Sequence, residues 1–193
     1  MTLRRHIQLL SVALLCVPLA AQRRTFMVAP DKSEVAFNLG DVLHTVRGTF
    51  RVSSGNVSFN PESSEISGDI QVAAGSGTSG NAVRDRRMNS TILGAPQFAV
   101  ASFRPERMVG SIAPTGDSTI EVSGILTLHG SPHMLSVPMQ LHVEGSRCTA
   151  KTHFIIPYVQ WGMKDPSTFV FRVAKEVSID LVLVGQISPN MSH

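Results

Sequence analysis

The chain has 193 residues, of which 42% are hydrophobic and only 16% are charged, and its formal net charge is +3. This length suits one domain with a sizeable core. Two of the cations, Arg4 and Arg5, lie in a segment that we expect to be removed, so the mature charge is close to balance. The basic pI is therefore no indication of a nucleic-acid partner, and we expect none.

Residues 1–21 have the pattern of a secretory signal peptide. Arg4, Arg5 and His6 form a basic start, residues 7–19 form an apolar core, and Ala20 and Ala21 supply the small residues of a cleavage site. The apolar core is shorter than the ~20 residues that a membrane-spanning helix needs. The pattern predicts a periplasmic or secreted protein with one domain over residues 22–188 and a short tail over 189–193.

Removal of this segment leaves Cys148 as the sole thiol, which excludes a disulfide within the mature chain. Cys148 lies in an alternating stretch, and we interpret it as a small buried hydrophobic residue.

Period-two alternation is the main structural signal along the chain. Val35, Phe37 and Leu39 share one face of a half-buried strand, and the pattern recurs over residues 64–74, 117–128, 135–143, 148–156 and 176–184. Gly48 is a candidate for a bulge or a close backbone approach. Residues 81–88 form the one plausible helix, with Ser79 or Asn81 as its N-cap.

About eight to ten closely spaced strands with one short helix predict an all-β antiparallel barrel or sandwich. We favour the barrel because closure removes the exposed edges that so many strands would otherwise present. A barrel of about eight strands either fills its interior with side chains or keeps a cavity for one ligand.

The connection over residues 157–171 holds the only Tyr and the only Trp of the chain. The preceding strand stops at Pro157, which cannot donate to a sheet ladder. Large apolar residues on such a connection are expected to cover an apolar space, so we interpret it as a lid or as a wall of the barrel mouth. Trp161 and Phe169 are the residues here that a packed core explains least well.

Catalytic motifs are absent from the sequence: it contains no G-x-S-x-G, H-E-x-x-H or Walker loop. We expect no enzyme, no metal and no cofactor other than a bound lipid. An enzyme that uses His44 with Asp41 or His129 stays open as an alternative. Arg84, Arg86 and Arg87 form either a solvated helix face or a cationic cluster at a cavity mouth, where Arg would suit a phosphate head group.

Several motifs, in their order and spacing, make the chain similar to the YceI-like family of secreted lipid- and polyisoprenoid-binding proteins. They are Ser33-x-Val35-x-Phe37, His44, Val46-x-Gly48-x-Phe50, Thr78 with Arg84-Asp85, Leu93-x-x-Pro96-x-Phe98, Gly124 to Gly130, Trp161-Gly162-Met163 and Val177-x-Ile179. The resemblance implies a lipocalin-like barrel with an elongated apolar cavity, and a carrier or sequestering role without chemistry. The chain departs from the family pattern at Arg87 or its neighbour, where a His is common, and at residues 158–160, where Arg-Ser-Asp is usual.

The function predicted from these observations is the binding, carriage or sequestration of a long-chain isoprenoid or quinone-like lipid. The predicted ligand-binding residues are Phe37, Leu39, His44, Val46, Phe50, Arg84, Met88, Phe98, Phe103, Trp161, Met163 and Phe169. Transient contact with a membrane surface and a homodimer are further expectations. The alternative is a structural or protein-interaction barrel whose core is filled.

Overall fold

The computed structural model describes residues 23–40, 45–169 and 172–189. Ten antiparallel strands form one sheet in the order β1-β4-β5-β6-β7-β8-β9-β10-β2-β3, and β1 also pairs with β10. The strands are β1 (Arg24–Val28), β2 (Glu34–Gly40), β3 (Thr45–Phe50), β4 (Val52–Phe59), β5 (Ile66–Ala73), β6 (Val100–Val109), β7 (Gly116–Leu128), β8 (Ser131–Glu144), β9 (Arg147–Ile156) and β10 (Val177–Pro189).

The ten segments occupy eight positions around a closed barrel. Strands β1 and β2 follow one another along β10, separated by a 3₁₀ turn over Pro30–Lys32. Strands β3 and β4 are separated only by Arg51. The predicted all-β, lipocalin-like barrel of about eight strands with one short helix is thereby confirmed.

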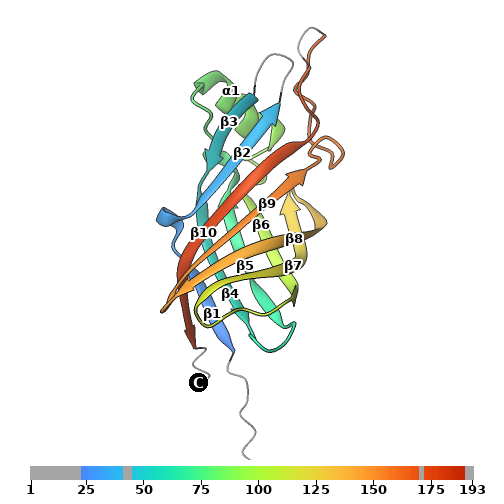
Figure 1. The fold of residues 1–193 in the computed structure, drawn as a ribbon. Coiled ribbons are helices and arrows are strands. Elements are labelled where there is room, and N and C mark those ends of the chain that lie inside the picture. The colour runs from blue at the N-terminus through green and yellow to red at the C-terminus, as the bar shows by residue number, and fades with distance from the viewer. Residues whose placement is uncertain (1–22, 41–44, 170–171, 190–193) are drawn as a thin grey trace, which may run out of the picture.

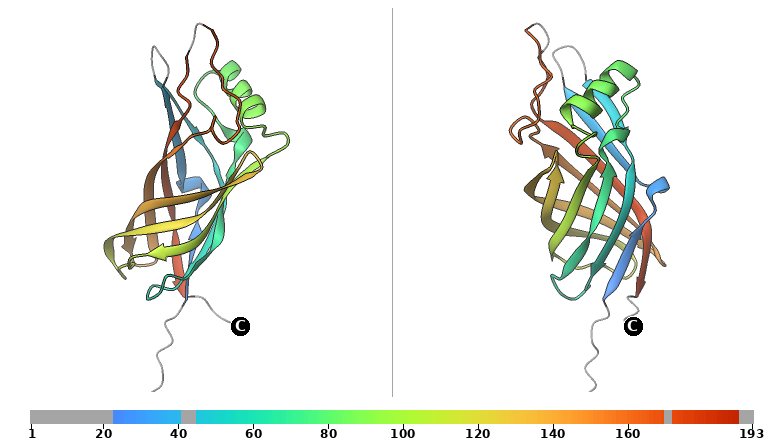
Figure 2. Two further views of the ribbon diagram at one scale, coloured as in Figure 1. Left: turned by 90° about the vertical axis from the view of Figure 1, so that its right-hand side faces the viewer. Right: turned by 180° about the vertical axis from the view of Figure 1, so that it is seen from behind.

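The barrel is elongated, and its two ends differ (Figure 1). The end of β2, the start of β3, the helix and the described parts of the crossover between β9 and β10 (residues 157–169 and 172–176) lie at one end, called the upper end here. The views in Figure 2 agree on this arrangement. The lower end holds the start of β1, the end of β10 and the β4–β5 and β6–β7 turns.

Helix α1 (Ala82–Arg87) continues through a wider turn over Met88–Ile92. The Asn81 side chain accepts hydrogen bonds from the backbone N–H groups of Val83 (3.1 Å) and Arg84 (3.0 Å), which confirms Asn81 as the N-cap. The Asp85 carboxylate accepts hydrogen bonds from Ser79, and these lower its pKa. This network fixes the loop that delivers the helix to the upper end.

Gly48 is a point of close approach, as its sequence context suggested. A Cβ atom there would collide with the carbonyl oxygen of Thr78 and with the ring of Phe37. The close approach allows two backbone hydrogen bonds between Thr49 and Thr78, of 2.9 and 3.0 Å. It therefore draws the loop before α1 onto β3.

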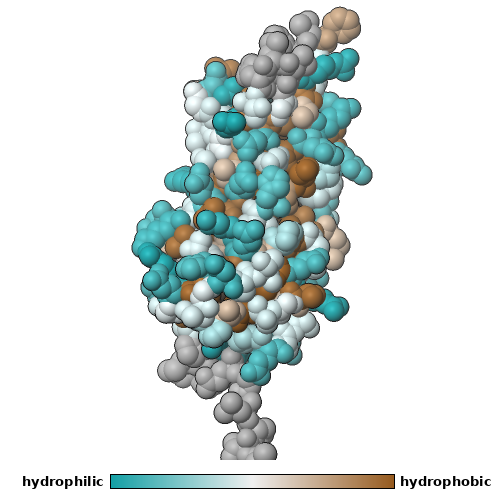
Figure 3. Space-filling model, in the orientation of Figure 1, coloured by the Kyte–Doolittle hydropathy of each residue, from teal (hydrophilic) through white to brown (hydrophobic). Residues whose placement is uncertain are grey.

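The least exposed side chains among the described residues lie in the lower half of the barrel. Met108 and Leu183 are each 1% exposed, and Cys148 is 2% exposed. The outer face in Figure 3 is mostly hydrophilic or neutral, with hydrophobic residues in separate spots. Within the described ranges, no helix combines the length and apolar character needed to cross a membrane. The predicted signal peptide (residues 1–21) lies outside the described residues.

Candidate functional site

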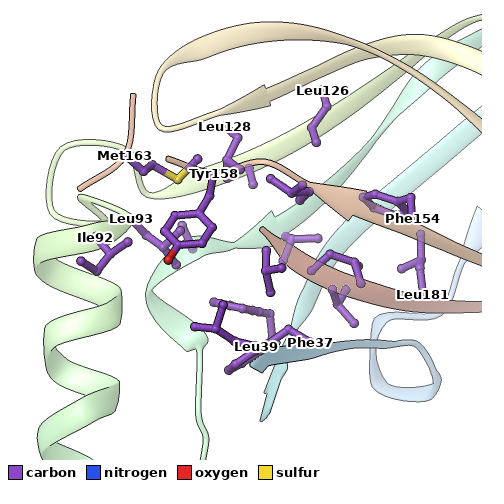
Figure 4. Close-up of a pocket in the computed structure, with 18 of the residues that line it drawn as sticks. Phe37, Leu39, Ile92, Leu93, Leu126, Leu128, Phe154, Tyr158, Met163 and Leu181 are labelled. Carbon is purple, nitrogen blue, oxygen red and sulfur yellow. The ribbon is translucent and has the colours of Figure 1, made fainter. Parts of the chain in front are cut away.

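A cavity of about 380 Å³ occupies the upper half of the barrel. Most of its wall is apolar and comes from inward-facing strand residues (Figure 4). Strands β2 and β3 contribute Val35, Phe37, Leu39, Val46 and Phe50, and β7 to β10 contribute Leu126, Leu128, Leu135, Phe154, Ile179 and Leu181.

The register of the strands explains why these side chains share the interior. Val35 is paired with both Phe50 on β3 and Leu181 on β10, and Phe37 is paired with Ile179. Ile179 is in turn paired with Phe154 on β9. Directly paired residues of an antiparallel sheet point to the same face, so these pairings carry an apolar row across four neighbouring strands.

The crossover forms part of the cavity wall through Tyr158, Met163, Pro166 and Val173. A tight turn, closed by the hydrogen bond from the Met163 N–H to the Tyr158 carbonyl (3.1 Å), brings the first two together. The Tyr158 hydroxyl donates to the Ala174 carbonyl at 2.7 Å, which ties the start of the crossover to its end. Burial, assisted by the charge of Asp165, raises the pKa of Tyr158 to about 12.

Trp161 and Phe169 do not line the cavity, contrary to the expectation that they would carry the lid. The tight turn directs Tyr158 and Met163 inward, whereas Trp161 stacks on His133 of β8 with ring centroids 3.9 Å apart. Phe169 is 99% exposed. The sequence pattern identified an apolar connection, but the direction of each side chain depends on this turn.

Phe98 also lies outside the cavity wall. Its ring contacts the edge of the His129 ring, with centroids 4.8 Å apart, and lies where a side chain on Gly130 would be. Phe98 therefore packs the β7–β8 turn against the segment before β6. His44, like Asp41, lies outside the described residues, so its predicted place at the site has no structural counterpart here.

The remaining predicted residues are brought together around one space. Phe37, Leu39, Val46, Phe50, Arg84, Met88, Phe103 and Met163 all line the cavity. Ligand binding by them stays a prediction.

Sequence reasoning missed a second group of lining residues, which are aliphatic and include Ile92, Leu126, Leu128, Ile156 and Leu181. The alternation along β7, β9 and β10 placed the strand residues of this group on the inner face. Aromatic size was given more weight than this alternation, and the aliphatic residues were passed over for that reason.

Two arginines of α1, Arg84 and Arg87, are the charged residues of the cavity wall. The Arg84 guanidinium donates to the Ser79 hydroxyl (2.7 Å) and to the Ser79 carbonyl (2.9 Å), so it is held in place. The wall is thus apolar over the strands and cationic beside the helix.

His129 and His133 make packing contacts with Phe98 and Trp161. Nδ1 of His129 lies 3.0 Å from the Leu93 carbonyl oxygen, and burial lowers the pKa of His133. In the part of the chain that the structure describes, no three His, Cys, Asp or Glu side chains are grouped so as to hold a metal ion.

Comparison with known proteins identifies the family of the chain and shows solved structures with the same fold. The model of the YceI-like domain family matches residues 26–185. A UPF0312 protein from Pseudomonas putida is 34% identical over 104 residues, which is 52% of this chain. The matched region spans about half (51%) of that curated relative.

Solved structures share the fold. Burkholderia cenocepacia BcnA superposes with a TM-score of 0.70 at 22% identity, over 82% of this chain and 99% of BcnA. A polyisoprenoid-binding domain from Saccharophagus degradans, implicated in plant cell wall breakdown, superposes with a TM-score of 0.61 at 16% identity, over 85% of this chain and 98% of that domain. The Campylobacter jejuni YceI protein gives a TM-score of 0.59 at 14% identity, over 75% and 86% of the two chains.

Proposed function

The chain belongs to the YceI-like family, and from that premise we propose that it binds a lipid with a long apolar chain in the upper half of its barrel. The ligand class we propose is an isoprenoid or a quinone-like lipid, and the role is carriage or sequestration without chemistry. The observation that carries the proposal is the 380 Å³ apolar cavity. The polyisoprenoid-binding domain that shares the fold adds support.

The energetics of the cavity favour a chain over a compact polar ligand. Burial of one methylene group contributes ~0.8 kcal/mol. A tail of several isoprene units therefore gains more from the wall of Phe37, Leu126 and Leu181 than a single charged contact would give. The ordering of a flexible tail offsets part of this gain.

The cationic side of the wall supports an anionic head group at the helix. Arg84 already donates to Ser79, whereas Arg87 reaches the same wall from the next turn of α1. We assign a phosphate or carboxylate head first to Arg87, because Arg presents a fork of donors that matches either group. Arg87→Gln should weaken the binding of farnesyl phosphate and leave that of farnesol unchanged.

Export and membrane contact belong to the same proposal. The N-terminal sequence pattern supports a periplasmic or secreted location. The fully exposed Phe169, on the crossover beside the cavity, supports transient contact with a bilayer surface during exchange of the lipid. Sedimentation with vesicles, compared between the mature protein and Phe169→Ser, tests this contact.

The test of lipid binding uses two neighbouring positions of β8. Leu135 lines the cavity, whereas Met134 is 69% exposed on the outer face. Leu135→Trp should fill the cavity and weaken farnesol binding about tenfold or more, the loss of roughly two buried methylene groups. Met134→Trp is the matched control and should bind farnesol as the parent protein does.

Equal binding by both tryptophan variants would place the lipid outside the barrel. Failure of the parent protein to bind farnesol, farnesyl phosphate or a quinone analogue would favour the alternative of a structural or interaction module. That alternative requires a filled interior, which the 380 Å³ cavity of the upper half does not provide.

A further inference from the structure

The interior of the barrel is divided into two chambers. Below the main cavity lies a void of about 60 Å³, lined by lower-half residues such as Phe26, Phe59 and Leu183. Three residues line both spaces: Ile70, Phe103 and Met139. They therefore form the boundary between the two chambers, and they are called the partition below.

The partition is built from two sides of the barrel. Ile70 on β5 and Phe103 on β6 are directly paired across neighbouring strands. Met139 comes from β8, which is separated from β6 by β7 in the sheet order. A barrel of about eight strands is only wide enough for side chains from its walls to fill the interior, so three large residues that border both spaces suffice to interrupt it.

The three residues differ in how freely their side chains can change rotamer. Ile70 is 8% exposed and β-branched, so its side chain has few alternative rotamers. Met139 is half-buried and unbranched, with three rotatable bonds and a thioether that adapts to irregular spaces. Met139 is thus the movable member of the partition.

The volume of the upper chamber limits how much chain it takes. An apolar cavity of ~150 Å³ holds one benzene molecule, so a chamber of this size accepts on the order of 15 carbon atoms, or about three isoprene units. A longer tail either leaves its remaining units at the rim or displaces the partition to reach the lower void.

We propose that Ile70, Phe103 and Met139 set the chain length that this protein selects, with an optimum near three isoprene units. This inference rests on the proposed function, because it concerns the same cavity. It assigns to Met139 a role in ligand specificity: its side chain decides whether a fourth unit is buried.

The experiment measures dissociation constants for isoprenoid alcohols of two, three and four units, namely geraniol, farnesol and geranylgeraniol. The parent protein should bind farnesol at least about tenfold more tightly than geraniol, and geranylgeraniol within about threefold of farnesol, because only buried carbons add affinity. Met139→Ala joins the chambers, so it should bind geranylgeraniol about tenfold more tightly than farnesol.

Gln140→Ala is the matched control, because Gln140 is the exposed neighbour of Met139 on β8 and lines neither chamber. It should keep the parent preference. Phe103→Leu removes less volume from the same partition than Met139→Ala does. It serves as the second variant if Met139→Ala does not fold. It should shift the preference in the same direction by a smaller factor.

The outcomes separate the two proposals. If none of the alcohols binds the parent protein, the proposed function fails. If all bind, and affinity still rises about tenfold from three to four units in the parent protein, the partition is no barrier and this inference alone is wrong. If Met139→Ala and Phe103→Leu both keep the chain-length preference of the parent protein, this inference alone is again wrong.

Discussion

The two halves of this barrel are built from the same strands and the same residue types, but the upper half encloses a large cavity and the lower half only a small void. Leu181 and Leu183 lie two residues apart on one face of β10, yet Leu181 lines the 380 Å³ cavity, whereas Leu183 is 1% exposed and borders only the void of about 60 Å³. In the lower half the strands from the opposite walls supply residues such as Met108 to pack against. Alternation therefore sets which face a residue occupies, but it does not set whether that residue borders the large upper cavity or the small lower void.

The upper half is more open because its strands separate. Strand β9 pairs with β8 only over Gln140–Glu144 of that strand, so the upper part of β8 diverges from β9. The crossover after β9 reaches β8 instead, where Trp161 stacks on His133. Pro138 lies in the diverging part, which suits a residue without an N–H donor, and its carbonyl accepts from the Thr152 hydroxyl at 2.7 Å.

The sharpest way to test the difference between the halves is to truncate the two leucines of β10. Leu183→Ala should lower the free energy of unfolding by roughly 2–5 kcal/mol, because it removes a side chain that is 1% exposed and enlarges the void beside it. Leu181→Ala should cost less than half as much, because Leu181 borders a cavity of about 380 Å³, whereas the void beside Leu183 is only about 60 Å³. Urea denaturation of both variants gives the comparison, and equal losses would contradict the division into a packed and a hollow half.

Alkaline pH should first destabilise the lower half of the barrel, which contains the buried thiol of Cys148. Burial raises the pKa of Cys148 from 9.0 to about 11, so in the unfolded chain the thiol loses its proton at lower pH than in the folded protein. The contribution of the buried neutral thiol to stability is complete below pH 9 and falls as the pH rises towards 11, by at most ~1.4 kcal/mol per pH unit. Unfolding measured from pH 8 to 11 should show this loss.

Cys148→Ala is the control, and its stability should change less over that interval. A parent curve that stays flat from pH 9 to 11 would show that the thiol is not desolvated in the folded protein.

Removal of one hydroxyl should loosen the upper half alone. Tyr158→Phe deletes the hydrogen bond to the Ala174 carbonyl, and a loss of about 1 kcal/mol is expected. Hydrogen exchange should quicken in the crossover near Met163 and Ala174 and remain unchanged in β7. Uniform protection across both regions would show that this bond does not hold the crossover.

The smallest effect is expected at Phe169. The side chain is 99% exposed, so Phe169→Ser should change the free energy of unfolding by less than about 0.5 kcal/mol. A thermal unfolding curve is sufficient to check this. A large loss would mean that the crossover packs Phe169 against the barrel.

Much of the architecture was accessible from the sequence, because it depends on local patterns. Alternation identified the strands, Asn81 marked the start of the helix, and Gly48 marked a close approach. The site was only partly accessible. Phe37 and Phe50, which alternation placed in the interior, line the cavity, whereas Trp161 stacks on His133 after a single tight turn that no periodicity encodes.

The division of the interior was also beyond the sequence. Met139 and Leu141 follow one another on the inner face of β8, and nothing local distinguishes them. Only the register of all eight strand positions places Met139 at the partition and Leu141 in the lower half.

The most direct test is to locate a bound chain by NMR. A fatty acid with a nitroxide label near its methyl end is added to protein with ¹³C-labelled leucine methyl groups, and signal broadening is recorded for each leucine. We predict strong broadening for Leu126, Leu128 and Leu181, which line the upper cavity, and much weaker broadening for Leu141 and Leu183. Broadening confined to exposed methyl groups, or none at all, would contradict a lipid site inside the barrel.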